Sequence, residues 1–424
     1  MRLPRRPFFN RSAHPRERRE HTPTFASLKV RNYRLYFIGA AISNNGTWMQ
    51  RIAQDWLVFE LTGSGLAVGI TMALQFGPML LLGLYGGVLA DRYAQRRILL
   101  ATQIGQMLCA VALSVLAFSG TVTAMAIYAV ALLLGIITTL DNPARQSFVG
   151  VMVPPSLLPN AVALNSGNFN LARLTGPAIA GVLVAAVGAG WAFAFNALSF
   201  VAMLGALALM NPAQFERAPR GRRGPGALRE GLAYVAQHPR IVVTLVLVLF
   251  IGTFGYNFPI ILTAYTGHIF TGDSALYGLL NSMMAAGSVF GALLAARRET
   301  VTPVLLQGTA AAFGAVMILL SLMGWLPAFM AVLMVTGLFA VSFNAMANAS
   351  VQLEADPAVR GRVMSLYFVL MMGTTPLGSL LTGWITDTWG APAALQVSGL
   401  ICVLATAGCA LASGRLERAT RSLN

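Results

Sequence analysis

The chain has 424 residues, of which 56% are hydrophobic and only 10% are charged. A soluble protein of this length needs more polar surface, so the composition excludes that class and indicates an integral membrane protein. The formal net charge is +15. In a soluble protein this charge would favour nucleic-acid binding, but here topology and anionic lipid headgroups explain it better, and no nucleic-acid partner is expected.

Apolar windows long enough to cross a bilayer recur along the whole chain. A hydrocarbon core of about 30 Å requires about 20 apolar residues per helix. Continuous apolar runs also exclude a closed barrel, whose strands would alternate apolar and polar residues. We therefore expect an all-α membrane protein with twelve transmembrane helices. They cover residues 35–60, 66–90, 98–118, 122–142, 161–187, 190–210, 241–265, 275–296, 303–323, 326–350, 363–386 and 393–412.

The basic residues follow the windows in a regular pattern. All but two of the 29 Lys and Arg residues precede the first window or follow an even-numbered one. Positively charged residues near the ends of a span resist translocation. The pattern predicts that these loops and both termini are cytoplasmic.

The longest polar stretch between two windows divides the chain into two six-helix halves. It contains a short amphipathic pattern that suits a helix beside the bundle. Six helices on each side of a linker are typical of a transporter with a site between the halves, near the middle of the membrane. We expect a basic N-terminal segment (1–34), a first half (35–210), a cytoplasmic linker (211–240), a second half (241–412) and a cytoplasmic tail (413–424).

The loop after the second window carries the most specific motif. Residues 86–97 read GGVLADRYAQRR. This resembles the G-x-x-x-D-R-x-G-R-R signature of the major facilitator superfamily, with Ala94 in place of the family's Gly and Gln95 where a basic residue is common. The resemblance implies that Asp91 interacts with a neighbouring helix N-terminus and favours the outward-facing state. The implied cytoplasmic gate comprises Gly87, Asp91, Arg92, Arg96, Arg97 and Arg145.

Three further stretches extend the resemblance over nearly the whole chain after residue 26. Residues 44–64, 141–181 and 360–383 are similar to the bacterial subgroup that includes the enterobactin exporter and related drug:proton antiporters. This similarity implies a monomeric secondary transporter in the bacterial inner membrane, which exports drug-like or siderophore-like molecules in exchange for protons. An importer or lipid flippase on the same fold, or a non-transporting membrane sensor, are the alternatives.

The first window carries a polar stripe. Asn44, Trp48, Arg51 and Asp55 are spaced 4, 3 and 4 residues apart and share one helical face. A charge at mid-bilayer costs at least about 2.5–3.5 kcal/mol, which makes each one a functional candidate. Burial favours the protonated form of Asp55, whereas the Arg51 cation favours the ionised form. We predict Asp55 as the proton carrier and Arg51 as its partner, with a permanent structural ion pair or direct substrate contact as alternatives.

A second acid–base pair ends the fourth window, where Arg145 follows Asp141 by one turn. Asp141 is a further candidate for proton coupling. The alternatives are a brace of the cytoplasmic gate or a solvated pair at the membrane rim.

The superfamily resemblance implies that spans 1, 4, 7 and 10 line a central cavity. Aromatic and amide side chains on these spans favour a bulky, partly apolar solute. Packing of the aromatics and interhelical hydrogen bonds of the amides are the alternatives. The predicted substrate contacts are Asn44, Trp48, Arg173, Phe254, Asn257, Asn344, Asn348 and Gln352.

No signature of an enzyme is present. The chain has no phosphate-binding loop, and its three cysteines, Cys109, Cys402 and Cys409, lie within apolar windows. We therefore expect no catalytic residues, cofactor or metal site. An ion gradient must supply the energy, because one charge crossing 100 mV provides about 2.3 kcal/mol.

Overall fold

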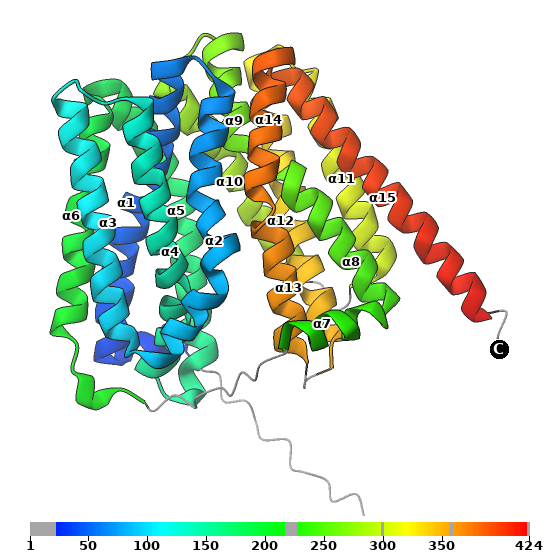
Figure 1. Cartoon of the computed structure of the whole chain (residues 1–424), viewed down its shortest axis with the longest axis horizontal. Helices are drawn as coiled ribbons and strands as arrows, with labels where there is room; N and C mark the ends of the chain where they lie inside the picture. Colours follow the sequence, from blue (N-terminus) through cyan, green and yellow to red (C-terminus); the bar gives the residue numbers. More distant parts are fainter. Residues whose placement is uncertain (1–22, 217–226, 298–300, 357–358, 422–424) are drawn as a thin grey trace, which may run out of the picture.

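The computed structural model describes residues 23–216, 227–297, 301–356 and 359–421, without the side chains of 84–92, 227–231 and 415–421. These described residues are almost entirely helical and contain no strand. Two helical bundles lie side by side (Figure 1). The first consists of α1 (Arg31–Thr62), α2 (Gly65–Arg92), α3 (Gln95–Phe118), α4 (Ala124–Met152), α5 (Leu158–Val187) and α6 (Ala189–Leu209).

The second bundle follows a short linker helix, α7 (Ala227–Ala236), which lies beneath it (Figure 1). Two of its spans, Pro239–Ile269 and Arg360–Trp389, are divided into shorter helical segments. The remaining elements are α8 (Pro239–Phe250), a π-helical turn (Ile251–Gly255), α9 (Phe258–Ala264), a second π-helical turn (Tyr265–Ile269), α10 (Ser274–Ala296), α11 (Pro303–Ser321), α12 (Leu326–Glu354), α13 (Arg360–Met372), α14 (Thr375–Trp389) and α15 (Ala391–Arg421).

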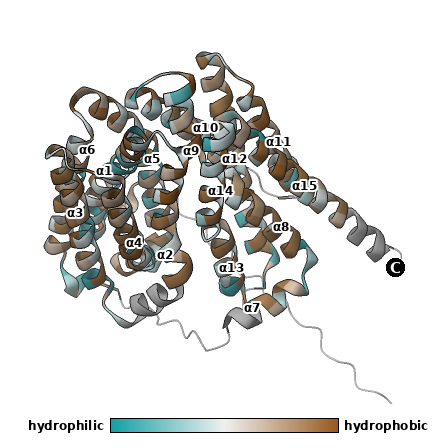
Figure 2. Cartoon of the chain, turned by 45° about the horizontal axis from the view of Figure 1, so that its top comes forward, coloured by the Kyte–Doolittle hydropathy of each residue, from teal (hydrophilic) through white to brown (hydrophobic). Residues whose placement is uncertain are grey.

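Within the described residues, eleven helical segments are long and apolar enough to cross a membrane. Hydrophobic residues predominate along most of the helices (Figure 2). Large apolar side chains such as Leu81 and Met125 are 75% and 73% exposed, as expected of a surface that faces lipid. The all-helical membrane fold predicted from the sequence is confirmed.

The twelfth span is α1, whose polar residues exclude it from the eleven. Its 32 residues extend about 48 Å at 1.5 Å per residue, which is enough to cross a bilayer. The first bundle satisfies several of its polar groups. Asn196 of α6 donates a 2.6 Å hydrogen bond to Gln50, and Asn168 of α5 donates one of 3.1 Å to the Phe37 carbonyl. Packing within the bundle therefore accommodates a helix that hydropathy alone would reject.

The fourth span is longer than predicted. The apolar window ends at residue 142, but α4 continues to Met152 and includes both Pro143 and Arg145. Arg145, which follows the predicted window, therefore lies inside the helix. Asp141 and Arg145 neutralise each other by an ion pair of 2.9 Å, which allows the helix to continue through two charged positions.

The ends of three helices in the first bundle meet at the end where α1 and α3 begin. Arg96 Nε at the start of α3 donates to the Leu207 carbonyl at 2.8 Å, and Arg31 at the start of α1 donates to the Leu209 carbonyl at 3.1 Å. Both acceptors are among the final carbonyls of α6, which lack partners within the helix. Cations at a helix C-terminus also complement the helix dipole. We call this end, with Arg31 and Arg96, the basic end.

The two bundles meet at the opposite end. Gly181 of α5 faces Gly278 of α10 so closely that a Cβ on Gly278 would lie 2.8 Å from the Gly181 Cα. Ser274 Oγ of α10 donates a 3.3 Å hydrogen bond to the Gly181 carbonyl. On the other side of the molecule, α2 packs against α14. The bundles thus close against each other along two pairs of helices at this end.

Candidate functional site

A cavity of about 320 Å³ lies between the two bundles. Eight helices from both halves of the chain contribute to its walls: α1, α2, α5, α9, α10, α12, α13 and α14. Its lining is mainly apolar and aromatic, with a few charged and amide side chains, which is typical of a site for a small organic molecule. The lining residues are Trp48, Arg51, Ile52, Asp55, Met72, Gln75, Phe76, Phe169, Arg173, Pro177, Tyr256, Phe258, Pro259, Asn281, Met284, Ala285, Ala340, Val341, Asn344, Met371, Met372 and Thr375.

The polar stripe of α1 reaches this cavity. Trp48, Arg51 and Asp55 line it, as their common helical face predicts, whereas Asn44 does not. Close approach of α5 positions Trp48, because a Cβ at Gly176 would lie 2.6 Å from the Trp48 Cβ. A glycine at this position therefore allows α5 to pack directly on the backbone of α1.

Trp48 holds two guanidinium groups by cation–π contacts. The Arg51 Cζ lies 5.2 Å from the Trp48 ring centroid, and the Arg173 Cζ lies 5.9 Å from the same centroid. Arg51 also lies 5.9 Å from the ring centroid of Phe76. No hydrogen bond or ion pair joins either guanidinium to another residue within the described ranges. Their N–H donors thus remain available to a ligand in the cavity.

Asp55 is the one acidic residue among the described residues that line the cavity. It is 6% exposed, and Tyr277 of α10 in the opposite bundle donates a long hydrogen bond of 3.5 Å to its Oδ2. Tyr277 also stacks on Trp56, with ring centroids 5.9 Å apart. No ion pair forms between Asp55 and Arg51 in this part of the structure. The structural ion pair considered from the sequence is therefore open in this conformation.

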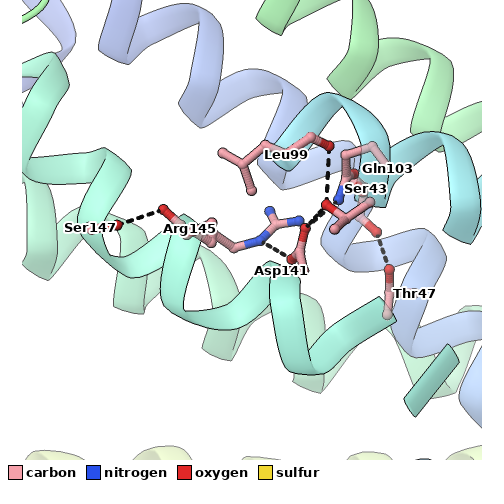
Figure 3. Close-up of polar contacts among 9 residues, drawn as sticks. Ser43, Thr47, Leu99, Gln103, Asp141, Arg145 and Ser147 are labelled. Carbon is pink, nitrogen blue, oxygen red and sulfur yellow. Dashed lines mark hydrogen bonds and ion pairs between the residues drawn. The ribbon is translucent and has the colours of Figure 1, made fainter. Parts of the chain in front are cut away.

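Asp141 and Arg145 form a separate polar cluster inside the first bundle (Figure 3). Asp141 is 3% exposed and accepts hydrogen bonds from Thr102 at 2.6 Å and from Gln103 at 3.1 Å, both on α3. Neither Asp141 nor Arg145 lines the cavity. The cluster joins α3 to α4, with Asp141 buried and Arg145 half-buried.

Only part of the aromatic and amide group on the seventh span reaches the cavity. Tyr256 and Phe258 line the cavity, but the candidates Phe254 and Asn257 do not. The π-helical turn at Ile251–Gly255 adds a residue to the turn and rotates the following positions by about 100° relative to a regular α-helix. Asn257 is buried and donates to the Thr253 carbonyl and to Thr382 of α14, at 2.7 Å and 3.0 Å.

The amide candidates of the tenth span are divided in the same way. Asn344 lines the cavity and accepts a 2.6 Å hydrogen bond from the Tyr367 hydroxyl. Asn348 and Gln352 lie outside the cavity, and Gln352 donates a 2.6 Å hydrogen bond to Asn348. These two amides therefore hydrogen-bond to each other further along the helix.

Only part of the gate motif can be placed. The side chains of Gly87, Asp91 and Arg92 lie outside the described residues. Arg96 donates hydrogen bonds to the Leu207 and Ala208 carbonyls at 2.8 Å and 3.3 Å, and Arg97 occupies the same first turn of α3. In its described part, the motif binds the C-terminal end of α6.

Several residues of the site were not singled out from the sequence. Gln75 and Phe76 of α2, Phe169 of α5 and Asn281 of α10 line the cavity. Phe169 lies one turn before Arg173 on the same face of α5, a spacing that could have marked it. For the other three, no local pattern distinguishes them from packing residues. Their role depends on which face of each helix the tertiary structure directs inward.

Asp387 at the end of α14 joins the two bundles at the end opposite the basic one. Its carboxylate accepts hydrogen bonds from the backbone N–H groups of Gly65 and Leu66, at 2.6 Å and 3.2 Å, and from the Ser64 hydroxyl. These donors form the N-terminus of α2 in the first bundle. A carboxylate from one bundle therefore caps a helix of the other.

The family model described as transmembrane secretion effector, a group of the major facilitator superfamily, matches residues 22–421. The chain belongs to this family. The superfamily assignment inferred from residues 86–97 is thus confirmed. Members of the family are transporters and not enzymes, so the chain is a multi-pass membrane transporter of small molecules.

Relatives and solved structures agree with this assignment. The staphyloferrin A transporter of Staphylococcus aureus is 26% identical over 373 residues, which are 84% of this chain and 91% of that protein. The multidrug efflux pump Tap of Mycolicibacterium fortuitum is 24% identical over 375 residues, or 84% and 89% of the two chains. A bacterial homologue of the human lysosomal transporter Spinster, inward-facing and unoccupied, superposes with a TM-score of 0.68 at 14% identity, covering 93% of this chain and 98% of that chain. This last similarity shows the fold.

Proposed function

We propose that the protein exports drug-like or siderophore-like molecules by alternating access, and that protons drive it through Asp55. The observation that carries the proposal is the cavity between the bundles, which Asp55 lines. At one end of the molecule, Asp387 joins the two bundles through the N-terminus of α2. The names of the efflux pump and the siderophore transporter among its relatives support the substrate class and the direction.

The arrangement of charges supports an inward-facing orientation. Arg31 and Arg96 lie together at the basic end, and the closed end carries the acidic residue Asp387. Because Arg-rich ends stay in the cytoplasm, we infer that both termini are cytoplasmic and that the closed end is periplasmic, in a bacterial inner membrane. The cavity would then receive its substrate from the cytoplasm.

Asp55 has the properties that proton coupling requires. Its carboxylate is buried, lies in the cavity and has no ion-pair partner in the described part of the chain, so a proton or a cationic group can neutralise it. It also accepts a hydrogen bond from Tyr277 in the opposite bundle. Rocking of the bundles would change this contact, so its proton affinity would differ between the two states.

The domain boundaries remain part of the proposal. The first half would comprise residues 35–210 and the second 241–412, with the segment 211–240, which includes α7, as a cytoplasmic linker. Each half would move as a unit around the cavity, as in other transporters with paired repeats. One chain contains the complete cavity, so we infer a functional monomer.

Proton release from energised everted vesicles tests this function. A pH-sensitive dye would report the response to a panel of cationic dyes, antibiotics and siderophores. We expect compounds that induce proton efflux with the wild-type protein and not with Asp55→Asn. Asp273→Asn is the matched control, because Asp273 caps α10 within its own bundle and lies outside the cavity.

An unchanged response in Asp55→Asn would refute proton coupling at this residue. No response to any compound, with the protein present and folded, would contradict export. It would favour the importer or flippase alternative.

A further inference from the structure

Charges of opposite sign line the cavity without pairing in the described part of the chain. Arg173 and Asp55 line the same cavity, and neither forms an ion pair with another residue of the described ranges. Charges that serve only to join helices are expected to pair directly, as Asp141 and Arg145 do at 2.9 Å. The unpaired charges of the cavity therefore indicate a ligand that provides both counter-charges.

Arg173 provides the positive subsite. Its guanidinium lies 5.9 Å from the centroid of the Trp48 ring, which orients it, while its N–H groups donate no hydrogen bond to a described residue. A planar guanidinium with free donors matches the geometry of a carboxylate, which it can bind through two parallel hydrogen bonds. A carboxylate on the ligand satisfies these donors and neutralises the charge.

Asp55 provides the negative subsite, two helical turns from Trp48 and thus about 10 Å along α1. Among the described residues, it accepts one side-chain hydrogen bond, the 3.5 Å contact from Tyr277. Its carboxylate therefore has unused acceptor capacity for an ammonium group. Arg51 lies between the two subsites along α1 and makes cation–π contacts with Trp48 and Phe76.

The wall between the charged groups is apolar. Met72, Phe76, Phe169, Phe258 and Met284 line the cavity, whose volume of about 320 Å³ lies in the range of sites for drug-sized molecules. We propose that the cavity selects elongated zwitterions, with a carboxylate at Arg173, an ammonium at Asp55 and an aromatic or apolar body between them. This inference rests on the proposed transport function and names its substrate class. It also explains antiport, because the ammonium and a proton compete for Asp55.

A matched set of four compounds tests the proposal by calorimetric binding to the purified full-length protein in lipid nanodiscs. They are 4'-(aminomethyl)biphenyl-4-carboxylate, its methyl ester, 4'-methylbiphenyl-4-carboxylate and the shorter zwitterion 4-(aminomethyl)benzoate. We expect the long zwitterion to bind about tenfold more tightly than each of the other three, because each of these lacks one charge-assisted contact or the length to make both. Equal affinities, or binding of none of the four, would overturn the proposal.

Two substitutions assign the subsites. Arg173→Gln is expected to abolish the preference for the long zwitterion over its methyl ester. Asp55→Asn is expected to abolish the preference for the long zwitterion over 4'-methylbiphenyl-4-carboxylate, which lacks the amine. Arg297→Gln is the matched control, because Arg297 is exposed at the end of α10. If Arg173→Gln fails to fold, Arg173→Lys retains the charge and should retain part of the preference. Preferences that survive both substitutions would overturn the proposal.

The outcome is separable from that of the proposed function, because binding is measured without a gradient. A zwitterion that binds with the predicted preferences but is not transported in vesicles contradicts the proposed function and supports the cavity's selectivity. Transport of the methyl ester without transport of the zwitterion would support the proposed function and contradict the cavity's selectivity.

Discussion

The contact between Asp387 and the N-terminus of α2 predicts how the closed end opens. Asp387→Ala removes the acceptor for the backbone N–H groups of Gly65 and Leu66 and for the Ser64 hydroxyl. These three hydrogen bonds join the bundles in the conformation described here. If the bundles separate at this end during transport, the substitution destabilises the closed conformation without an equal effect on the open one.

The magnitude follows from the number and exposure of the hydrogen bonds. Hydrogen bonds to a charged group contribute about 1.5–3 kcal/mol when buried, and a carboxylate at a helix N-terminus about 0.3–1 kcal/mol. Asp387 is exposed, so water replaces much of this interaction when the contact breaks. We therefore expect a net loss of about 1–2 kcal/mol, which changes the ratio of closed to open molecules by a factor of about 5–30.

Distance measurement between spin labels tests this expectation. The exposed residues Thr121 and Trp325 lie in loops of opposite bundles at the closed end and provide labelling sites. Labelling requires replacement of the native cysteines, which are all buried. Asp387→Ala should increase the population of long distances. Asp273→Ala is the control, since Asp273 caps α10 with bonds of 3.0 Å and 3.1 Å inside one bundle. Identical distance distributions for the two substitutions would refute the reasoning.

Two further predictions concern packing. Asp141→Asn removes the counter-charge of Arg145, whose side chain is only 20% exposed, so it should lower stability by about 1–3 kcal/mol. Adding Arg145→Gln should recover part of the loss, and thermal unfolding in detergent measures both. An unchanged unfolding temperature in Asp141→Asn would contradict this. Gly278→Ala places a Cβ 2.4 Å from the Pro177 carbonyl oxygen of the other bundle. It should therefore increase the population of long distances in the same spin-label assay. Gly205→Ala is the control, because nothing lies within 4 Å of the added Cβ. An unchanged distance distribution for Gly278→Ala would contradict this prediction, because it would show that the two helices shift to accommodate the added methyl group.

Local sequence determined most of the fold and one face of the site. Each span must satisfy its own backbone hydrogen bonds and needs about 20 mainly apolar residues to cross the bilayer, so the apolar windows matched most helix ends to within a few residues. The spacing of Trp48, Arg51 and Asp55 placed them on one face of α1, because helical periodicity depends only on the helix itself. The superfamily followed from the contiguous motif at residues 86–97.

Tertiary structure decided everything that depends on contacts between distant residues. The π-helical turn before Tyr256 changes which aromatic side chains face the cavity, and the burial of Asp141 follows from the side chains of α3. Tyr277 and Asp387 come to their partners from the opposite bundle, across 222 and 322 residues of sequence. Periodicity within a helix determines which residues share a face, but the direction of that face is set by the free energy of packing all twelve helices together. For this reason the sequence predicted a cavity and its charged stripe, and only the folded chain showed that the charges remain unpaired within it.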